Sequence, residues 1–96
     1  MTTEIKDIPL TDNKEEQRFE MNINGAIAFI AYEEHRGALA LVHTEVPESL
    51  EGKGVGSVLA LKTLEYLEAG GRKIIPLCPF VNSYIKRHPE WERIVS

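Results

Sequence analysis

Three glycines at alternate positions make residues 52–57 the stretch best suited to binding chemistry. They occur in the run Gly52-Lys53-Gly54-Val55-Gly56-Ser57, between a strand-like and a helix-like segment. Glycine permits sharp turns and lets a ligand approach the backbone with no Cβ in the way. The helix that follows directs unpaired N–H groups and its positive dipole end at the loop. We therefore predict an anion site for phosphate or pyrophosphate. The alternative is a flexible linker leading into a helix.

The spacing of the glycines narrows the choice of occupant. A P-loop needs lysine and then serine or threonine directly after its last glycine, whereas Lys53 precedes Gly54 and Gly56. A dinucleotide-binding loop needs a third glycine where Ser57 stands, together with a second βαβ half that the sequence does not show. The remaining candidate occupant of the loop is the pyrophosphate of coenzyme A.

Alternating and apolar runs predict three strands before the loop. Residues 17–23 alternate between apolar and polar side chains, as in a strand with one wet face. Asn24-Gly25 predicts a hairpin turn into the apolar run 26–32. A second turn at 34–37 leads to a strand over 38–46. An antiparallel three-stranded meander results.

A helix, a short strand and a second helix follow the loop. The helical apolar positions are Val55, Val58, Leu59, Leu61, Leu64 and Leu67. Gly70-Gly71 ends this helix through a left-handed C-cap. Residues 73–78 are strand-like, but Pro76 cannot donate to a sheet and so requires an edge or a gap in the pairing. The second helix runs from Pro79 to His88. The order β-β-β-α-β-α predicts an α+β fold.

Length and composition predict a single globular domain. The chain has 96 residues, 43% of them hydrophobic, and a net charge of −4, so we expect neither nucleic-acid nor membrane binding. Cys78 is the only cysteine, which excludes an intrachain disulfide. We find no targeting segment and expect a cytoplasmic protein, a monomer or weak dimer without a metal site. Residues 1–14 are predicted to form an N-terminal arm and residues 15–96 the domain.

Two blocks of sequence resemble the GCN5-related N-acetyltransferases. Residues 46–56 are similar to the acyl-CoA signature of that family, in which arginine or glutamine is followed by two residues, glycine, any residue, and glycine or alanine. Residues 43–47 and 76–91 resemble the minimal members of about one hundred residues. The resemblance covers residues 15–91. Glu51 departs from it, since a carboxylate stands where the family has arginine or glutamine, and this disfavours a pyrophosphate unless the side chain points away.

The resemblance implies a place for acetyl-CoA. The strands before and after the first helix splay apart, the pantetheine arm lies between them, and the thioester ends beside Cys78. The implied cofactor-binding residues are Thr44, Glu45, Val46, Gly52, Lys53, Gly54, Val55, Gly56, Ser57, Pro79, Asn82 and Lys86. For Asn82 and Lys86, one turn apart, the alternative is a solvated helix face.

Three residues are candidates for the catalytic steps that the resemblance implies. His43 alternates with Leu39 and Leu41 and is a candidate base, or else a hydrogen-bonded histidine of the core or its rim. Cys78 stands before a predicted helix, whose N-terminus favours a thiolate; it is a nucleophile, a thiol that lines the site, or a small buried hydrophobe. Tyr84 is a candidate proton donor to the departing thiolate, and the alternative is a packed helix residue.

The leading hypothesis is an acetyl-CoA-dependent N-acetyltransferase that acts on a small amine or an exposed amino group. The alternative is a non-catalytic acyl-CoA-binding or sensor domain, because the chain lacks the N-terminal helices that build the acceptor pocket in larger relatives. A third hypothesis, an interaction domain that has lost CoA, draws support from Glu51. No second motif selects an acceptor.

Overall fold

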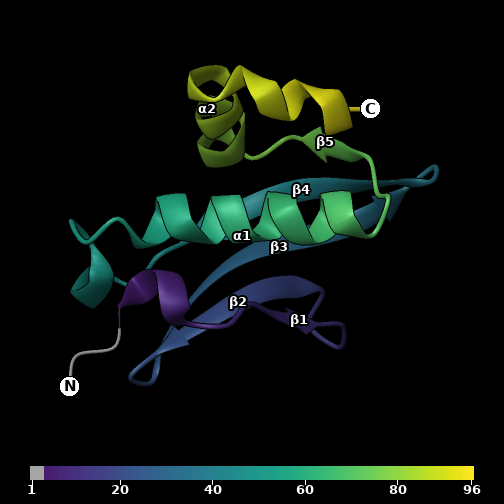
Figure 1. The fold of residues 1–96 in the computed structure, drawn as a ribbon. Coiled ribbons are helices and arrows are strands. Elements are labelled where there is room, and N and C mark those ends of the chain that lie inside the picture. Colours follow the sequence, from purple (N-terminus) through teal and green to yellow (C-terminus); the bar gives the residue numbers. More distant parts are fainter. Residues whose placement is uncertain (1–3) are drawn as a thin grey trace.

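The computed structural model describes residues 4–96, which form a sheet of five strands and two α-helices (Figure 1). The strands, in their spatial order, are β1 (Thr11–Asn13), β2 (Arg18–Ile23), β3 (Ala26–His35), β4 (Ala38–Glu45) and β5 (Ile74–Pro76). The first four pair antiparallel, and β5 lies parallel to β4. The predicted α+β class is confirmed, but the antiparallel part of the sheet has four strands where three were predicted.

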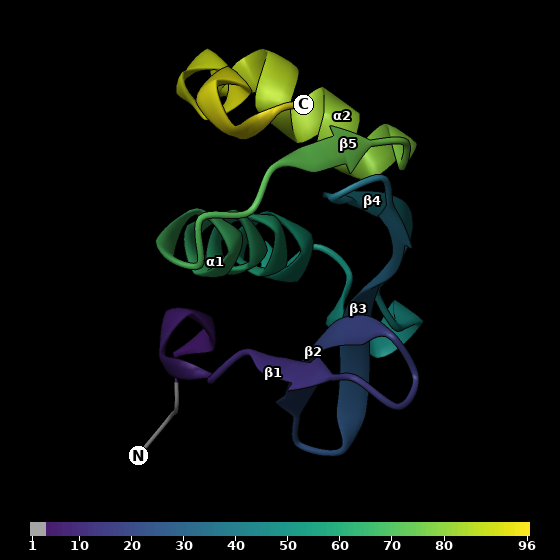
Figure 2. The ribbon, with the colours of Figure 1, turned by 90° about the vertical axis from the view of Figure 1, so that its right-hand side faces the viewer.

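The helices pack at different parts of this sheet. The α-helices are α1 (Val55–Ala69) and α2 (Pro79–Arg87), and short 3₁₀ helices span Ile5–Asp7, Glu48–Leu50 and Pro89–Ile94. In the side view, α1 lies on one side of β3, and α2 lies beyond β5 (Figure 2). We call the side of the sheet that α1 covers the core face, and the other side the outer face.

Both predicted hairpin turns are present. Asn24 and Gly25 have φ angles of 53° and 90°, and Arg36 and Gly37 have φ angles of 51° and 87°. Two successive positive φ angles are those of a type I′ turn, whose twist matches that of the flanking strands. These turns join β2 to β3 and β3 to β4.

The edge strand β1 was not predicted from the sequence. It pairs with β2, and the Tyr32 hydroxyl donates a hydrogen bond to Asp12 at 2.6 Å. Ile5, Ile8 and Leu10 pack against the core. Residues 4–14 of the predicted arm therefore lie against the domain, whereas its first three residues lie outside the described part of the chain.

A bulge in β4 reverses the faces of its last residues. Ala31 of β3 pairs with His43, but the next residue of β3 pairs with Leu41, so Val42 is an extra residue. Because side chains alternate along a strand, this insertion moves Thr44 to the core face and His43 to the outer face. The predicted common face of His43 with the two preceding leucines is therefore wrong.

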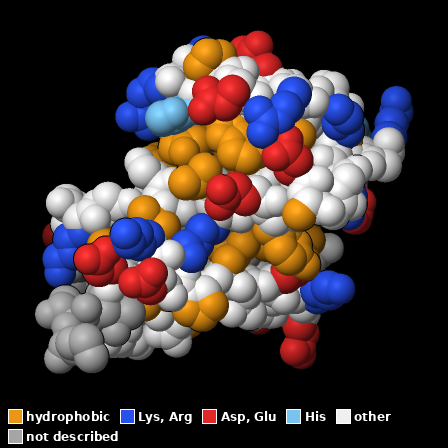
Figure 3. All heavy atoms as spheres, viewed as in Figure 1, with side chains coloured by type: hydrophobic (Ala, Val, Ile, Leu, Met, Phe, Trp, Pro, Cys, Tyr) orange, Lys and Arg blue, Asp and Glu red, His pale blue; other side chains and the backbone are white. Residues whose placement is uncertain are grey.

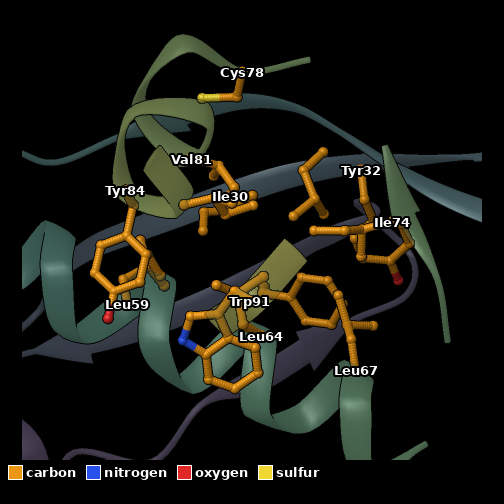
Figure 4. Packing of buried hydrophobic residues seen from close by; sticks show 14 of the residues in the cluster. Ile30, Tyr32, Leu59, Leu64, Leu67, Ile74, Cys78, Val81, Tyr84 and Trp91 are labelled. Atoms are coloured by element: carbon orange, nitrogen blue, oxygen red, sulfur yellow. The ribbon is translucent and has the colours of Figure 1, made fainter. Parts of the chain in front are cut away.

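The core lies between α1 and the sheet, and it is closed by α2 and the C-terminal 3₁₀ helix (Figure 4). The buried residues of α1 are Val55, Leu59, Ala60, Thr63, Leu64 and Leu67. Leu61, predicted to share the apolar face, is 36% exposed. Repeated steps of three residues drift around a helix of 3.6 residues per turn, so the predicted set cannot share one face. Trp91 is also buried.

Acidic and basic side chains are interspersed on the face of the molecule shown in Figure 3, with hydrophobic side chains exposed between them. Single-sign patches are the usual footprint of electrostatic binding to a polyanion. Among residues 4–96, none of the helices has the length and apolar character required to cross a membrane.

Candidate functional site

The glycine loop has the geometry of an anion cradle. Gly52 and Gly54 adopt left-handed φ angles of 78° and 75°, which side chains with a Cβ rarely adopt. The N–H of Val58 donates to the carbonyl of Gly54 at 3.2 Å, whereas the N–H groups of residues 54–57 have no hydrogen-bond partner within the described chain. Four donors at the positive end of α1 are therefore free for a ligand.

A cavity of about 230 Å³ adjoins these donors. Its lining residues are Val46, Leu50, Glu51, Gly52, Gly54, Val55, Gly56, Ser57 and Phe80. The Glu51 and Lys53 side chains of this loop are both exposed to solvent. The free donors and left-handed glycines fit a pyrophosphate. The exposed Glu51 carboxylate repels a pyrophosphate only as far as water and salt do not screen its charge.

Gly56 differs from the other two glycines. It is helical, and a Cβ built on it would lie 2.6 Å from Cζ of Phe80. Its lack of a side chain is therefore required by packing against α2, and the predicted role in ligand approach does not explain this contact. Phe80 was not among the predicted site residues, because contacts between two helix starts far apart in sequence leave no local pattern.

The edge of β4 becomes free where β5 ends. Pairing between the two strands extends to Leu41 and Pro76, the proline predicted to lie at a gap. One further bond joins them, from the N–H of Cys78 to the carbonyl of Leu41 at 2.7 Å. In the described chain, no backbone hydrogen bond links residues 42–45 to the segment that follows β5. This edge is open to an extended ligand with amide groups.

Cys78 closes the inner end of that edge. Its sulfur lies 2.9 Å from the Thr44 hydroxyl, and its side chain is only 2% exposed. Val46 and Phe80, two residues further along each segment, line the loop cavity. The structure thus brings Thr44, Val46, Cys78 and the glycine loop along one track, which runs from a thiol to the free N–H groups.

Asn82, Lys86 and Pro79 do not lie at the loop. They line a separate cavity of about 420 Å³ beside Leu77. The Asn82 amide donates to the carbonyl of Pro76 at 3.3 Å, which ties α2 to the end of β5. The structure therefore shows a structural contact for Asn82 and does not bring Asn82 or Lys86 to the anion cradle.

Tyr84 lies apart from Cys78. Its ring points towards Leu59 of α1 and away from the thiol (Figure 4), and it packs 4.3 Å from the His88 ring. Burial, and then the negative charges of Glu90 and Glu65, raise the pKa of the Tyr84 hydroxyl. The side chain remains a neutral phenol, in a position that suits packing better than proton donation beside Cys78.

His43 and Glu45 occupy the outer face at the free edge of β4. Both side chains are exposed, and the His43 ring lies 6.1 Å from the Phe29 ring in an edge-on arrangement. They are separated by the sheet from the core-facing Thr44 hydroxyl. An imidazole here can take a proton only from a group that approaches the outer face.

A larger cavity, of about 640 Å³, lies at the opposite end of α1 from the glycine loop. It is lined by aromatic residues, including Tyr32 and the half-exposed Tyr66, and by charged residues such as Asp12 and Arg72. None of the predicted site residues lines it, so its size does not mark it as the site of the predicted chemistry.

Several known proteins are similar to this chain in sequence. Protein NATD1 of Mus musculus is 27% identical over 86 residues, covering 85% of this chain and 77% of that protein. Protein NATD1 of Xenopus tropicalis is 26% identical over 85 residues, covering 85% and 78%, and that of Gallus gallus is 27% identical over 86 residues, covering 85% and 77%.

The GCN5-related N-acetyl-transferase family pattern matches residues 18–94, which include every strand and helix from β2 to the C-terminal 3₁₀ helix. The match supports acetyltransferase function in general. Because it spans most of the 96 residues, this chain belongs to the GCN5-related N-acetyltransferase family.

Proposed function

We propose that this protein is an acetyl-CoA-dependent N-acetyltransferase that acts on an amine. The observation that carries the proposal is the track of Thr44, Cys78 and Val46, which leads from a buried thiol to four free N–H groups at the start of α1. A helix N-terminus that binds pyrophosphate and a fixed position for the thioester are two features that the use of acetyl-CoA requires.

Each part of the track has a role in the proposal. The N–H groups of residues 54–57 bind the pyrophosphate, with Gly52 and Gly54 holding the loop in its left-handed shape. The unpaired edge at residues 42–45 offers backbone groups to the amides of the pantetheine arm. Glu45 is exposed at this edge and contributes its backbone, whereas Thr44 contributes a hydroxyl that faces the core.

Acetyl-CoA supplies the acyl group: the amine nitrogen bonds to the carbonyl carbon, the carbon–sulfur bond breaks, a base takes the amine proton, and that proton passes to the CoA thiolate, so that CoA departs as thiol. In the proposal the thioester lies beside Cys78, whose sulfur is buried and contacts Thr44. We favour direct attack by the amine over an acetylated Cys78. His43 is the candidate base for an acceptor that arrives at the outer face.

The test is acetyl transfer by the purified protein. It is incubated with acetyl-CoA and a panel of primary amines and amino-terminal peptides, release of the CoA thiol is followed, and products are identified by mass spectrometry. We expect an acetylated amine and equimolar CoA. His43→Gln should lower kcat by about 10²-fold while leaving CoA affinity unchanged, as loss of a general base does. Absence of both transfer and CoA binding would contradict the proposal.

A second function, acyl-CoA binding without turnover, is favoured by two observations. The Cys78 side chain is 2% exposed, and the outer face of β3 and β4 has no α-helix to wall an acceptor pocket within residues 4–96 (Figure 2). Tight binding of acetyl-CoA with no acetylated product from any amine in the panel would establish this second function over the first.

A further inference from the structure

Phe80 joins the two helix starts between which the proposed ligand would lie. It is the second residue of α2, two positions after Cys78, and it is half-buried against the core. Its ring edge points at the backbone of Gly56, the second residue of α1. A single side chain therefore spans from the segment that carries the thiol to the segment that carries the free N–H groups.

The identity of residue 56 reflects this contact. A Cβ at position 56 would lie 2.6, 3.2 and 3.4 Å from three atoms of the Phe80 ring, and the first of these distances is so short that the ring would have to shift. Glycine is otherwise a poor choice in a helix, where alanine is preferred. By contrast, Gly54 has no atom within 4 Å of an added Cβ and is required by its φ angle of 75°. The two glycines are thus needed for different reasons.

From this geometry we infer that Phe80 is a positioning residue, which fixes the separation between the anion cradle and the Cys78 thiol by packing its ring edge on Gly56. The inference rests on the proposed function and deepens it. Phe80 also lines the loop cavity with Val46 and Leu50, so the same ring forms part of the wall of the cradle. The affinity of a ligand that contacts both the cradle and the thiol region depends on this separation, whereas the affinity of a ligand that contacts the cradle alone does not.

The contact is tested first by stability, without any ligand. Gly56→Ala, Phe80→Leu and the double variant are compared with the parent by urea denaturation. Leucine retains much of the buried volume but has no atoms where the ring edge lies. We expect Gly56→Ala to be destabilised and the double variant to be more stable than Gly56→Ala alone. Gly70→Ala is the control, because an added Cβ there has only ordinary contacts at 3.6 Å and beyond.

The positioning role is tested by comparing CoA with ADP, which carries a pyrophosphate without the pantetheine arm. Phe80→Leu should lower CoA affinity by about tenfold through misplacement of the thiol region. ADP affinity should change by less than about twofold, because the cradle is retained. A role in stability alone would change both affinities by a similar factor.

Three outcomes overturn the inference. One is that Gly56→Ala lowers the free energy of unfolding by the same amount in the parent and in Phe80→Leu. Such a result would mean that the contact between Gly56 and the Phe80 ring does not exist. Another is a parallel change, or no change, in CoA and ADP affinity for Phe80→Leu. A parent protein that binds neither ligand contradicts the proposed function and the positioning role together, and the stability cycle then shows whether the contact serves packing alone.

Discussion

The pairing of Cys78 with Thr44 is the residue-level feature on which the chemistry depends. The 2.9 Å contact joins a buried thiol at the start of α2 to a hydroxyl on the core face of β4. Thr44 reaches this face only because Val42 is an extra residue in the strand. A shift of one residue would replace the hydroxyl by a neighbouring side chain and leave the sulfur without this partner.

Replacing Cys78 with alanine tests whether the thiol is acylated. With direct attack by the amine, Cys78→Ala should keep kcat within about threefold of the parent, with a small loss of stability from the missing sulfur. Intact-protein mass spectrometry after incubation with acetyl-CoA alone should show no added acetyl group. A hydroxylamine-sensitive acetyl adduct on the parent, together with an inactive Cys78→Ala that still binds CoA, would instead establish an acyl-enzyme.

At the scale of elements, the junction between β4 and α1 creates the cradle. The chain leaves the sheet at Glu45, passes a short 3₁₀ helix at Glu48–Leu50, and enters α1 through the left-handed Gly54. This entry leaves the first N–H groups of the helix unpaired and aimed at the loop cavity. The cradle is thus a property of backbone shape, which few side chains at position 54 could reproduce.

Gly54→Val should weaken both folding and binding. The φ angle of 75° is strained for a β-branched residue although an added Cβ meets no atom within 4 Å, so the expected cost is about 1–3 kcal/mol. Denaturation curves and CoA titrations measure the two effects. Gly70→Ala is the matched control because its φ angle is −86°. An unchanged CoA affinity in Gly54→Val would show that the loop is not the binding site.

The hydrogen bond from Tyr32 to Asp12 anchors β1 to the rest of the sheet. Burial and then the Asp12 carboxylate raise the pKa of Tyr32 well above its usual range. Tyr32→Phe should cost about 1–2 kcal/mol at pH 7, because Asp12 loses its donor. Faster hydrogen exchange at residues 11–13 would locate the effect.

The raised pKa also predicts the direction of the alkaline dependence. The unfolded tyrosine ionises near pH 10, whereas the folded one stays neutral, so its stabilising contribution is present below about pH 10 and is lost as the pH rises further. In urea denaturation between pH 8 and pH 11, the free energy of unfolding should fall less steeply with pH for Tyr32→Phe than for the parent. Equal declines in both proteins would contradict this assignment.

Seen across the whole molecule, α1 separates two cavities of different character. Its N-terminal end carries the loop cavity and the free donors, and its C-terminal end borders the larger cavity that contains Tyr66 and Arg72. Only the first lies beside the open edge of β4 and Cys78. We therefore propose that the ligand binds at the smaller cavity, on the basis of chemistry and not of volume.

Strands β2 to β5, the two α-helices and the glycine loop could be predicted because each has a local signal, such as the alternation in β2 or the Asn24-Gly25 turn. The faces on which the β4 side chains lie could not be predicted. The bulge leaves the alternation of Leu39, Leu41 and His43 in the sequence but places His43 on the opposite face of the sheet from the two leucines. The strand β1 is three residues long and lacks an apolar pattern. The partner of Gly56 was equally hidden, since the contact with Phe80 depends on tertiary packing.

The most direct test of the central claim is a titration of the ¹⁵N-labelled protein with CoA, followed by amide chemical shifts. We expect large shifts at residues 54–57 and along residues 42–45 of the free β4 edge, with a smaller shift at Cys78. Residues 69–72, at the far end of α1, should remain unmoved. Shifts confined to the larger cavity near Tyr66, or none at residues 54–57 while the fold is intact, would contradict it.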